Sequence, residues 1–114
     1  MSHAAPEVLV LGAGVSGLVT AVTLAERGAR ITLRESGPKV GSGASWFAGG
    51  MLAPWCEAES APAEVTRDSV MSVEWWAEHV PDVKRHGTLV LAPPRDTPEL
   101  SRFGRKTSHF DIID

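Results

Sequence analysis

The sequence predicts an α/β protein, on three observations in its first 35 residues. Residues 8–11, VLVL, form an unbroken apolar run, as in a parallel strand that is buried on both faces. Residues 12–17, GAGVSG, follow directly and match the pattern G-x-G-x-x-G, and a second apolar strand over residues 31–33 is soon followed by Glu35. This order of strand, glycine turn, helix, strand and acid predicts a Rossmann-like βαβ unit that binds a nucleotide.

The three glycines of this pattern have different tasks. Gly12 makes the tight turn, Gly14 leaves room for a pyrophosphate beside the backbone, and Gly17 lets the helix pack closely against the strand. The helix is expected to begin near Val15 or Ser16, so that its free N–H groups and positive dipole end face the phosphates.

The rest of the unit follows from the same pattern. The predicted helix ends at Gly28 and buries one apolar face, formed by Leu18, Ala21, Val22 and Ala25. Glu35 lies 18 residues after Gly17, where a dinucleotide site places the carboxylate that accepts hydrogen bonds from a ribose.

A membrane segment or an apolar hairpin is the alternative for this region, because residues 8–25 carry no charge. The spacing of the glycines and the threonines and serine among them argue against it. A signal peptide is disfavoured too, since Glu7 and no Lys or Arg precedes the run. We therefore expect no membrane partner.

Composition limits the function further. The 114 residues have the length of one small domain, and a net charge of -3 without a basic block argues against nucleic acid as a partner. Cys56 is the only cysteine, which excludes an intramolecular disulfide and fits the cytoplasm. The histidines lack metal-ligand spacing, so no metal site is expected and all four are placed on the surface or in loops: His3, His79, His86 and His109.

A chain of this length contains only a small part of the sheet that the predicted fold requires. Two parallel strands and one helix leave open faces and edges, so we expect the chain to be the front of a longer protein. The predicted domains are an N-terminal unit over residues 1–56, and a connecting helix with the start of an incomplete α+β substrate domain over residues 57–114. Assembly of identical chains into a homo-oligomer stays open.

Residues 36–54, SGPKVGSGASWFAGGMLAP, are rich in small side chains. Such residues permit close approach to a flat ligand, and a short helix from Ser45 would aim its N–H groups at phosphate. A flexible linker is the alternative. Further on, we predict a helix over residues 63–80, a short strand over residues 87–92, and a helix with Thr97 as N-cap that reaches Lys106.

These segments together resemble a known family. GAGVSG, the pair Glu35 and Ser36, GASWFAGGMLAP at residues 43–54 and GTLVLAPP at residues 87–94 resemble the D-amino-acid oxidase-like flavoproteins, and among them the glycine oxidases of thiamine biosynthesis. The resemblance implies FAD as cofactor and oxidation of glycine, or a small amine or D-amino acid, to an imine. Hydrolysis then gives glyoxylate and ammonia, and oxygen is reduced to hydrogen peroxide.

The resemblance also implies positions for the cofactor. The FAD pyrophosphate is cradled by Gly12, Gly14, Val15, Ser16 and Gly17. The adenosine ribose is held by Glu35 and Ser36, and the pyrophosphate is met from the other side by Ala44 and Ser45. The isoalloxazine ring is flanked by Gly49, Gly50 and Met51. Met51 also lines the pocket of the small amino-acid substrate, although from the pattern alone it is a core residue.

The attachment of FAD is expected to be non-covalent. In related dehydrogenases a histidine of this segment carries flavin, and Phe47 stands at that position here. Cys56 is interpreted as a small packed thiol. No catalytic residue is assigned, because the family's substrate-binding arginine lies beyond Asp114.

The alternatives are a truncated, non-catalytic nucleotide-binding remnant, and a sarcosine oxidase or D-amino-acid dehydrogenase of the same superfamily. We expect no oxidase activity from these 114 residues alone.

Overall fold

The computed structural model describes residues 4–113, which form two compact units divided between Gly50 and Met51. The first unit contains β1 (Glu7–Leu11), α1 (Val15–Glu26), β2 (Arg30–Arg34) and the 3-10 turn η1 (Ala44–Phe47). The second contains α2 (Pro54–Glu57), α3 (Ala63–His79), the 3-10 turn η2 (Pro94–Asp96) and α4 (Thr97–Gly104). The domain limit predicted at residue 56 stays a prediction.

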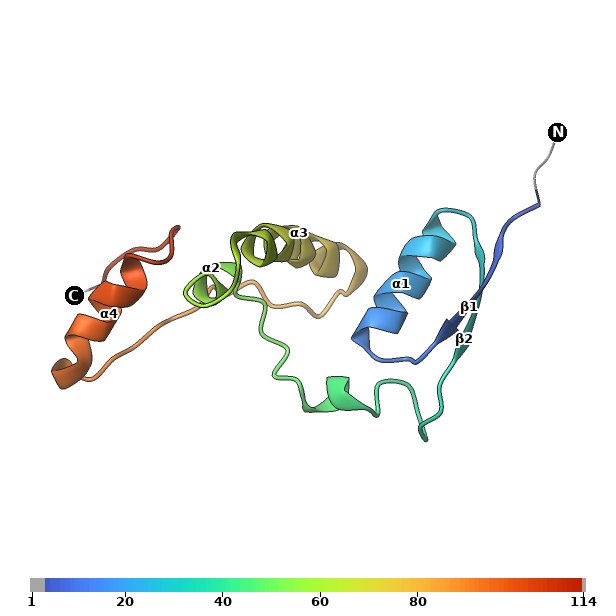
Figure 1. The fold of residues 1–114 in the computed structure, drawn as a ribbon, viewed down its shortest axis with the longest axis horizontal. Helices are drawn as coiled ribbons and strands as arrows, with labels where there is room; N and C mark the ends of the chain where they lie inside the picture. Colours follow the sequence, from blue (N-terminus) through green and yellow to red (C-terminus); the bar gives the residue numbers. More distant parts are fainter. Residues whose placement is uncertain (1–3, 114) are drawn as a thin grey trace. The chain divides into compact units, whose positions relative to one another are not determined.

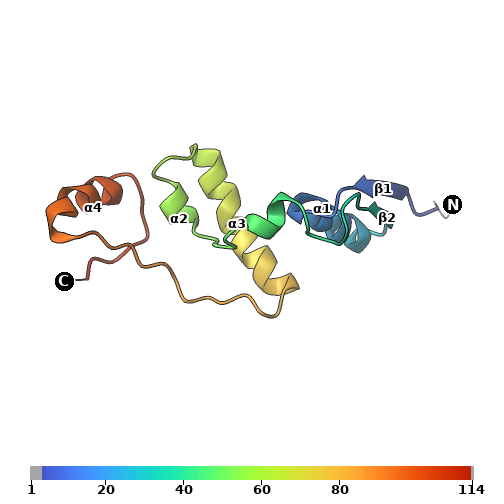
Figure 2. The same cartoon turned by 90° about the horizontal axis from the view of Figure 1, so that it is seen from below.

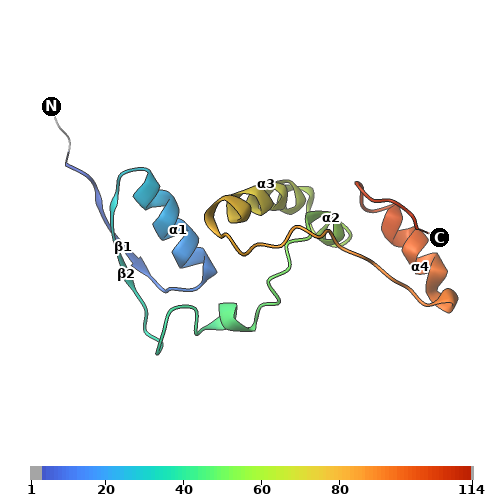
Figure 3. The ribbon, with the colours of Figure 1, turned by 180° about the vertical axis from the view of Figure 1, so that it is seen from behind.

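In the first unit, the two strands are parallel and α1 connects them. Val8 lies opposite Ile31 and Val10 lies opposite Leu33 in the register of the sheet. Parallel strands need a crossover connection, and α1 supplies it by running back along one face of the strands (Figures 1 and 3). The predicted α/β class and its Rossmann-like βαβ start are confirmed.

The helix packs on the sheet through its smallest residue. A Cβ added at Gly17 would overlap the carbonyl oxygen of Gly12 and lie 3.5 Å from Cγ1 of Val10. The predicted buried face is correct for Leu18 and Ala21, which are half-buried. It is wrong for the remaining two predicted positions, Val22 and Ala25, which are exposed. No other segment among residues 4–113 covers these two side chains.

Gly28 ends α1 as predicted. Its φ of +89° is in the left-handed region that favours glycine, and its N–H donates to the carbonyl of Ala25 at 2.9 Å. The sheet itself is covered on one side only. Leu9 is 53% exposed and Leu11 is 74% exposed, so the apolar run of β1 is not buried on both faces within the described chain.

The second unit is built on α3. This helix confirms the one predicted over residues 63–80, and α2 packs beside it (Figure 2). Near its end, the rings of Trp75 and Trp76 meet edge to face with centroids 5.1 Å apart, and His79 stacks on Trp75 at 4.0 Å. His79 is therefore half-buried in a helix rather than a surface or loop residue as predicted. Between residues 4 and 113, no helix has the length and apolar character to cross a membrane.

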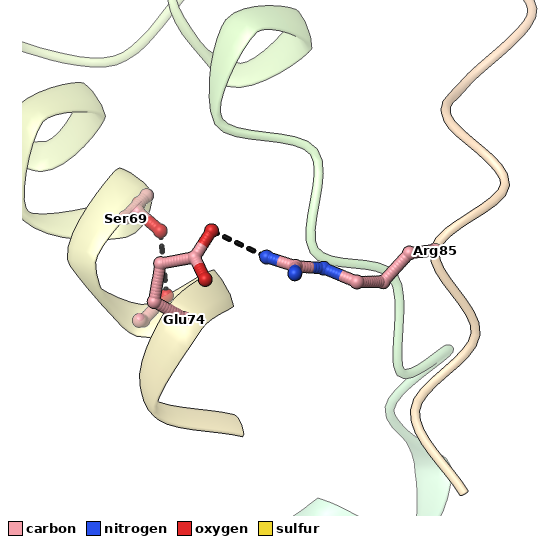
Figure 4. Close-up of polar contacts among 4 residues, drawn as sticks. Ser69, Glu74 and Arg85 are labelled. Carbon is pink, nitrogen blue, oxygen red and sulfur yellow. Dashed lines mark hydrogen bonds and ion pairs between the residues drawn. The ribbon is translucent and has the colours of Figure 1, made fainter. Parts of the chain in front are cut away.

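The segment after α3 is held to it by one charged contact. Nη2 of Arg85 bonds Oε1 of Glu74, while Oγ of Ser72 donates to the carbonyl of Ser69 within the helix at 2.8 Å (Figure 4). The strand predicted over residues 87–92 is not formed. A strand needs a neighbour to accept its backbone hydrogen bonds, and no other described segment pairs with it.

The last helix, α4, begins close to the predicted position, but its N-cap residue is not the predicted one. Asp96 holds the N-cap position of α4, and Thr97 is its first residue. The hydroxyl of Thr97 donates to the carbonyl of Pro94 at 2.9 Å, so it serves the preceding 3-10 turn rather than the helix N–H groups. The prediction of Thr97 as N-cap is therefore wrong.

The close contact of Gly17 with the turn yields a test. We expect Gly17→Ala to destabilise the first unit by about 1–3 kcal/mol, because the added methyl must displace the carbonyl of Gly12. Amide hydrogen exchange of β2 should then accelerate roughly 5- to 150-fold. The matched control is Gly43→Ala, where φ is -81° and a Cβ would meet nothing within 4 Å. Equal exchange rates in the two variants would contradict this packing.

Candidate functional site

The turn between β1 and α1 forms the base of the site. The φ of Gly12 is +98°, which few residues besides glycine adopt. Its N–H donates to the carbonyl of Arg34 at 2.7 Å, extending the ladder of the two strands. Ala13 is fully buried, and Gly14 holds the N-cap position of α1. The turn thus sets the N-terminus of the helix directly above the ends of both strands.

The carboxylate of Glu35 ties this turn to the end of β2. Its Oε2 accepts a hydrogen bond from the N–H of Ala13 at 2.6 Å, and its Oε1 accepts one from the N–H of Gly37 at 2.7 Å. The hydroxyl of Ser36 adds a longer contact of 3.5 Å to Oε1. The N–H of Gly37 and that of Ala13 hold the pKa of Glu35 below its ordinary value of 4.5, against a smaller opposing effect of desolvation.

The segment after Glu35 folds back onto the same turn. The N–H of Gly41 donates to the carbonyl of Ala13 at 2.9 Å. Further along, Oγ of Ser45 in η1 accepts a hydrogen bond from the N–H of Val15 at 2.9 Å. This N–H belongs to the first turn of α1, where backbone donors have no partner inside the helix. Residues 36–45 are therefore docked by defined hydrogen bonds, which disfavours the linker alternative for this part of the segment.

Space at the turn depends on Gly14. A Cβ at this position would lie 3.1 Å from Oγ of Ser45, closer than most real Cβ contacts. Only a glycine leaves this narrow gap between the turn and η1 clear. The outer side of η1 is covered by a cation–π contact, in which Nζ of Lys39 lies 4.3 Å from the ring centroid of Trp46.

The structure joins part of the predicted site set by direct contacts. The residues joined by hydrogen bonds or close approach are Gly12, Gly14, Val15, Glu35, Ser36 and Ser45. Ala44 precedes Ser45 in η1, and Gly17 packs below the turn. Ser16 is exposed in the first turn of α1, and a Cβ at Gly49 would meet nothing within 4 Å. The cofactor and substrate roles of all the predicted site residues stay predictions, those of Ser16, Gly49, Gly50 and Met51 included.

Three backbone positions in the site were not predicted from the sequence. Ala13 lies inside the glycine pattern, but its small apolar side chain gives no sign that its N–H meets a carboxylate. Gly37 and Gly41 belong to a glycine-rich segment after β2. Their spacing was the available signal that the backbone makes close contacts there.

A metal centre finds no support in the described part of the chain. No group of three or more His, Cys, Asp or Glu side chains between residues 4 and 113 is arranged to hold an ion. His3 lies outside the described residues.

Taken together, a parallel βαβ unit, an N-terminal helix end beside a glycine turn and a carboxylate after the second strand define a dinucleotide-binding protein. The groups fit a pyrophosphate and a ribose, because N–H donors and an acid acceptor converge where no side chain stands at Gly14. The family can be stated more closely. The chain belongs to the FAD dependent oxidoreductase (DAO) family, whose model matches residues 7–112.

Similar proteins include three bacterial enzymes. The chain is 52% identical over 108 residues to "Putative thiamine biosynthesis oxidoreductase ThiO" of Rhizobium etli, covering 94% of this chain and 33% of that protein. It is 36% identical over 100 residues to D-amino acid dehydrogenase 2 of Ralstonia nicotianae, covering 86% and 21%. It is 48% identical over 56 residues to glycine oxidase of Pseudomonas aeruginosa, covering 49% and 15%. No solved structure shows significant similarity to the chain.

The chain thus spans about a third or less of the length of these curated relatives. The family assignment covers nearly all of the present sequence, whereas the activity of the relatives belongs to proteins several times longer.

The Glu35 hydrogen bonds predict a pH dependence. A carboxyl whose pKa is lowered by folding stabilises the folded state above its unfolded pKa, and this contribution is lost as pH falls through the lower folded pKa. We expect the amide proton signals of Ala13 and Gly37 to titrate together, with a midpoint below 4.5, in NMR spectra. Glu35→Gln should abolish the shared titration. Separate midpoints, or one at or above 4.5, would contradict the bidentate contact.

Proposed function

We propose that this chain is the N-terminal, FAD-binding part of an oxidase that acts on glycine and supplies its product to thiamine thiazole synthesis. The observation that carries the proposal is the convergence of the Glu35 carboxylate, the N–H of Val15 and the hydroxyl of Ser45 around the glycine turn. The 52% identity to the thiamine biosynthesis oxidoreductase over nearly the whole chain supports the role in thiamine synthesis. The 48% identity to a glycine oxidase over 56 residues supports the choice of glycine as substrate.

The residues of this chain bind and orient the cofactor. The N–H groups at the start of α1 and the hydroxyl of Ser45 donate to the pyrophosphate, which Gly14 allows to approach. Glu35 accepts hydrogen bonds from the ribose hydroxyls, for which each carboxylate oxygen keeps a second lone pair. For the other predicted positions we propose the roles that the family resemblance implies. The residues around the dinucleotide are Gly12, Ser16, Gly17, Ser36 and Ala44. The residues beside the flavin ring and the substrate are Gly49, Gly50 and Met51.

Bound FAD supplies two-electron chemistry, in which the substrate α-carbon loses a hydride to the flavin ring. The amine loses a proton and becomes an imine, water converts the imine to glyoxylate and ammonia, and oxygen takes up the two electrons to give hydrogen peroxide. No residue in this chain is assigned to the substrate carboxylate. The cytoplasm is the proposed compartment, since it keeps a single cysteine reduced.

A second candidate is a D-amino-acid dehydrogenase, favoured by the 36% identity to such an enzyme over 86% of this chain. A dehydrogenase passes its electrons to an acceptor other than oxygen. In a full-length version that contains this chain, release of one hydrogen peroxide for each glycine consumed supports the oxidase, and its absence with turnover in the presence of a quinone supports the dehydrogenase.

Cofactor binding can be tested at Gly14. We expect Gly14→Val to abolish retention of FAD, because a branched side chain would fill the gap between the turn and Ser45. The measurement is the visible flavin absorbance that remains after incubation with FAD and desalting. Ala25→Val is the matched control, since it adds a valine on the exposed side of α1. Equal flavin retention in both variants would remove Gly14 from the proposed site.

The mode of attachment has its own test. Phe47 offers no nucleophilic atom to the flavin and its side chain is 83% exposed, so FAD should be held without a covalent bond. Acid precipitation should leave all of the flavin in the supernatant. Flavin absorbance that remains with the washed, unfolded protein would contradict non-covalent binding.

A further inference from the structure

The second unit contains a cavity that the proposed cofactor site does not use. It is an open hollow with a volume of about 740 Å³, which lies within the range of small-molecule sites. One wall is formed by α2 and α3, and the other by the residues that follow α4. The lining residues are Trp55, Ala58, Ala63, Thr66, Arg67, Val70, Met71, Arg105, Lys106, Thr107 and Ser108.

The second wall is fixed by three contacts. The hydroxyl of Thr107 donates to the carbonyl of Trp55, and the ring of His109 stacks on the Trp55 indole with centroids 4.0 Å apart. Nζ of Lys106 lies 3.8 Å from Oε1 of Glu59. The residues after α4 are therefore held against α2, and the cavity is a feature of the folded second unit.

The charges around this cavity have one sign. Arg67, Arg105 and Lys106 line it, and no Asp or Glu does, although the chain has 14 acidic and 11 basic residues. Arg67 pairs with the adjacent Asp68 at 3.0 Å in an exposed pair, which contributes little. Arg105 forms no ion pair with any described residue, so its guanidinium is available to an anion.

A hydroxyl in the lining lacks a partner as well. Oγ1 of Thr66 is shielded from solvent and makes no hydrogen bond within the described chain. Burial of such a group without a partner is unfavourable. Since solvent does not reach this oxygen, Thr66 is not assigned a contact with a ligand.

Apart from the hydroxyls of Thr107 and Ser108, the remaining lining is apolar, with Trp55, Val70 and Met71 as its largest members. A bare inorganic anion would leave these side chains unused. We propose that this cavity binds a small organic carboxylate with an apolar body. Its carboxylate pairs with Arg105, and its hydrocarbon part lies against α2 and α3. The inference rests on the second unit alone and is independent of the proposed cofactor site.

The test uses hexanoate and its uncharged analogue hexanamide on the complete 114-residue chain, by NMR titration. We expect hexanoate to bind with a Kd of about 1 mM and to shift signals of residues that line the cavity. Hexanamide should bind at least fivefold more weakly. Equal binding of the two probes, or no binding of hexanoate, would overturn the proposal.

Two variants assign the binding to named groups. Arg105→Gln should weaken hexanoate binding at least fivefold and leave hexanamide unchanged, whereas Arg105→Lys should restore part of the affinity. Arg102→Gln is the matched control, because Arg102 lies on α4 outside the cavity and pairs with Glu99. Circular dichroism of each variant verifies that the helices are retained. The same loss in Arg102→Gln and Arg105→Gln would also overturn the proposal.

Discussion

The first unit depends on the carboxylate of Glu35. This one group accepts hydrogen bonds from Ala13, in the turn after β1, and from Gly37, in the segment that leaves β2. It therefore fixes the two places where the chain departs from the sheet. The return of residues 36–45 toward the turn, and with it the position of Ser45, starts from this contact. A charged acceptor suits the task because its hydrogen bonds are stronger than those of a neutral one.

Much of this unit could be predicted from the sequence, because local patterns determine it. The apolar runs gave the strands, the glycine spacing gave the turn, and Gly28 gave the end of α1. Val22 and Ala25 were misplaced because apolar spacing shows that a helix has a buried side but not how much covering structure is present. The hydrogen bond from the N–H of Ala13 to Glu35 could not be predicted, because the sequence does not show which backbone N–H groups meet a side chain.

In the second unit, less of the structure could be predicted from the sequence. The helix over residues 63–80 was predictable because its own hydrogen bonds lie within one segment. The strand over residues 87–92 was not, because a strand depends on a partner elsewhere in the chain, and Leu89 and Leu91 are exposed where that partner is lacking among residues 4–113. The contact of Thr107 with Trp55 joins positions 52 residues apart and has no sequence signal.

The hydrogen bond from Val15 to Ser45 has a consequence for selectivity. The N–H of Val15 already donates to Oγ of Ser45. An anion that displaces Ser45 therefore gains only the difference in free energy between its own hydrogen bond and the one that it replaces. Free phosphate would therefore bind weakly at this end of the helix. A ligand that has both a phosphate and a ribose diol gains a second contact, with Glu35. The turn, closed by Ser45, therefore favours such long ligands over simple anions.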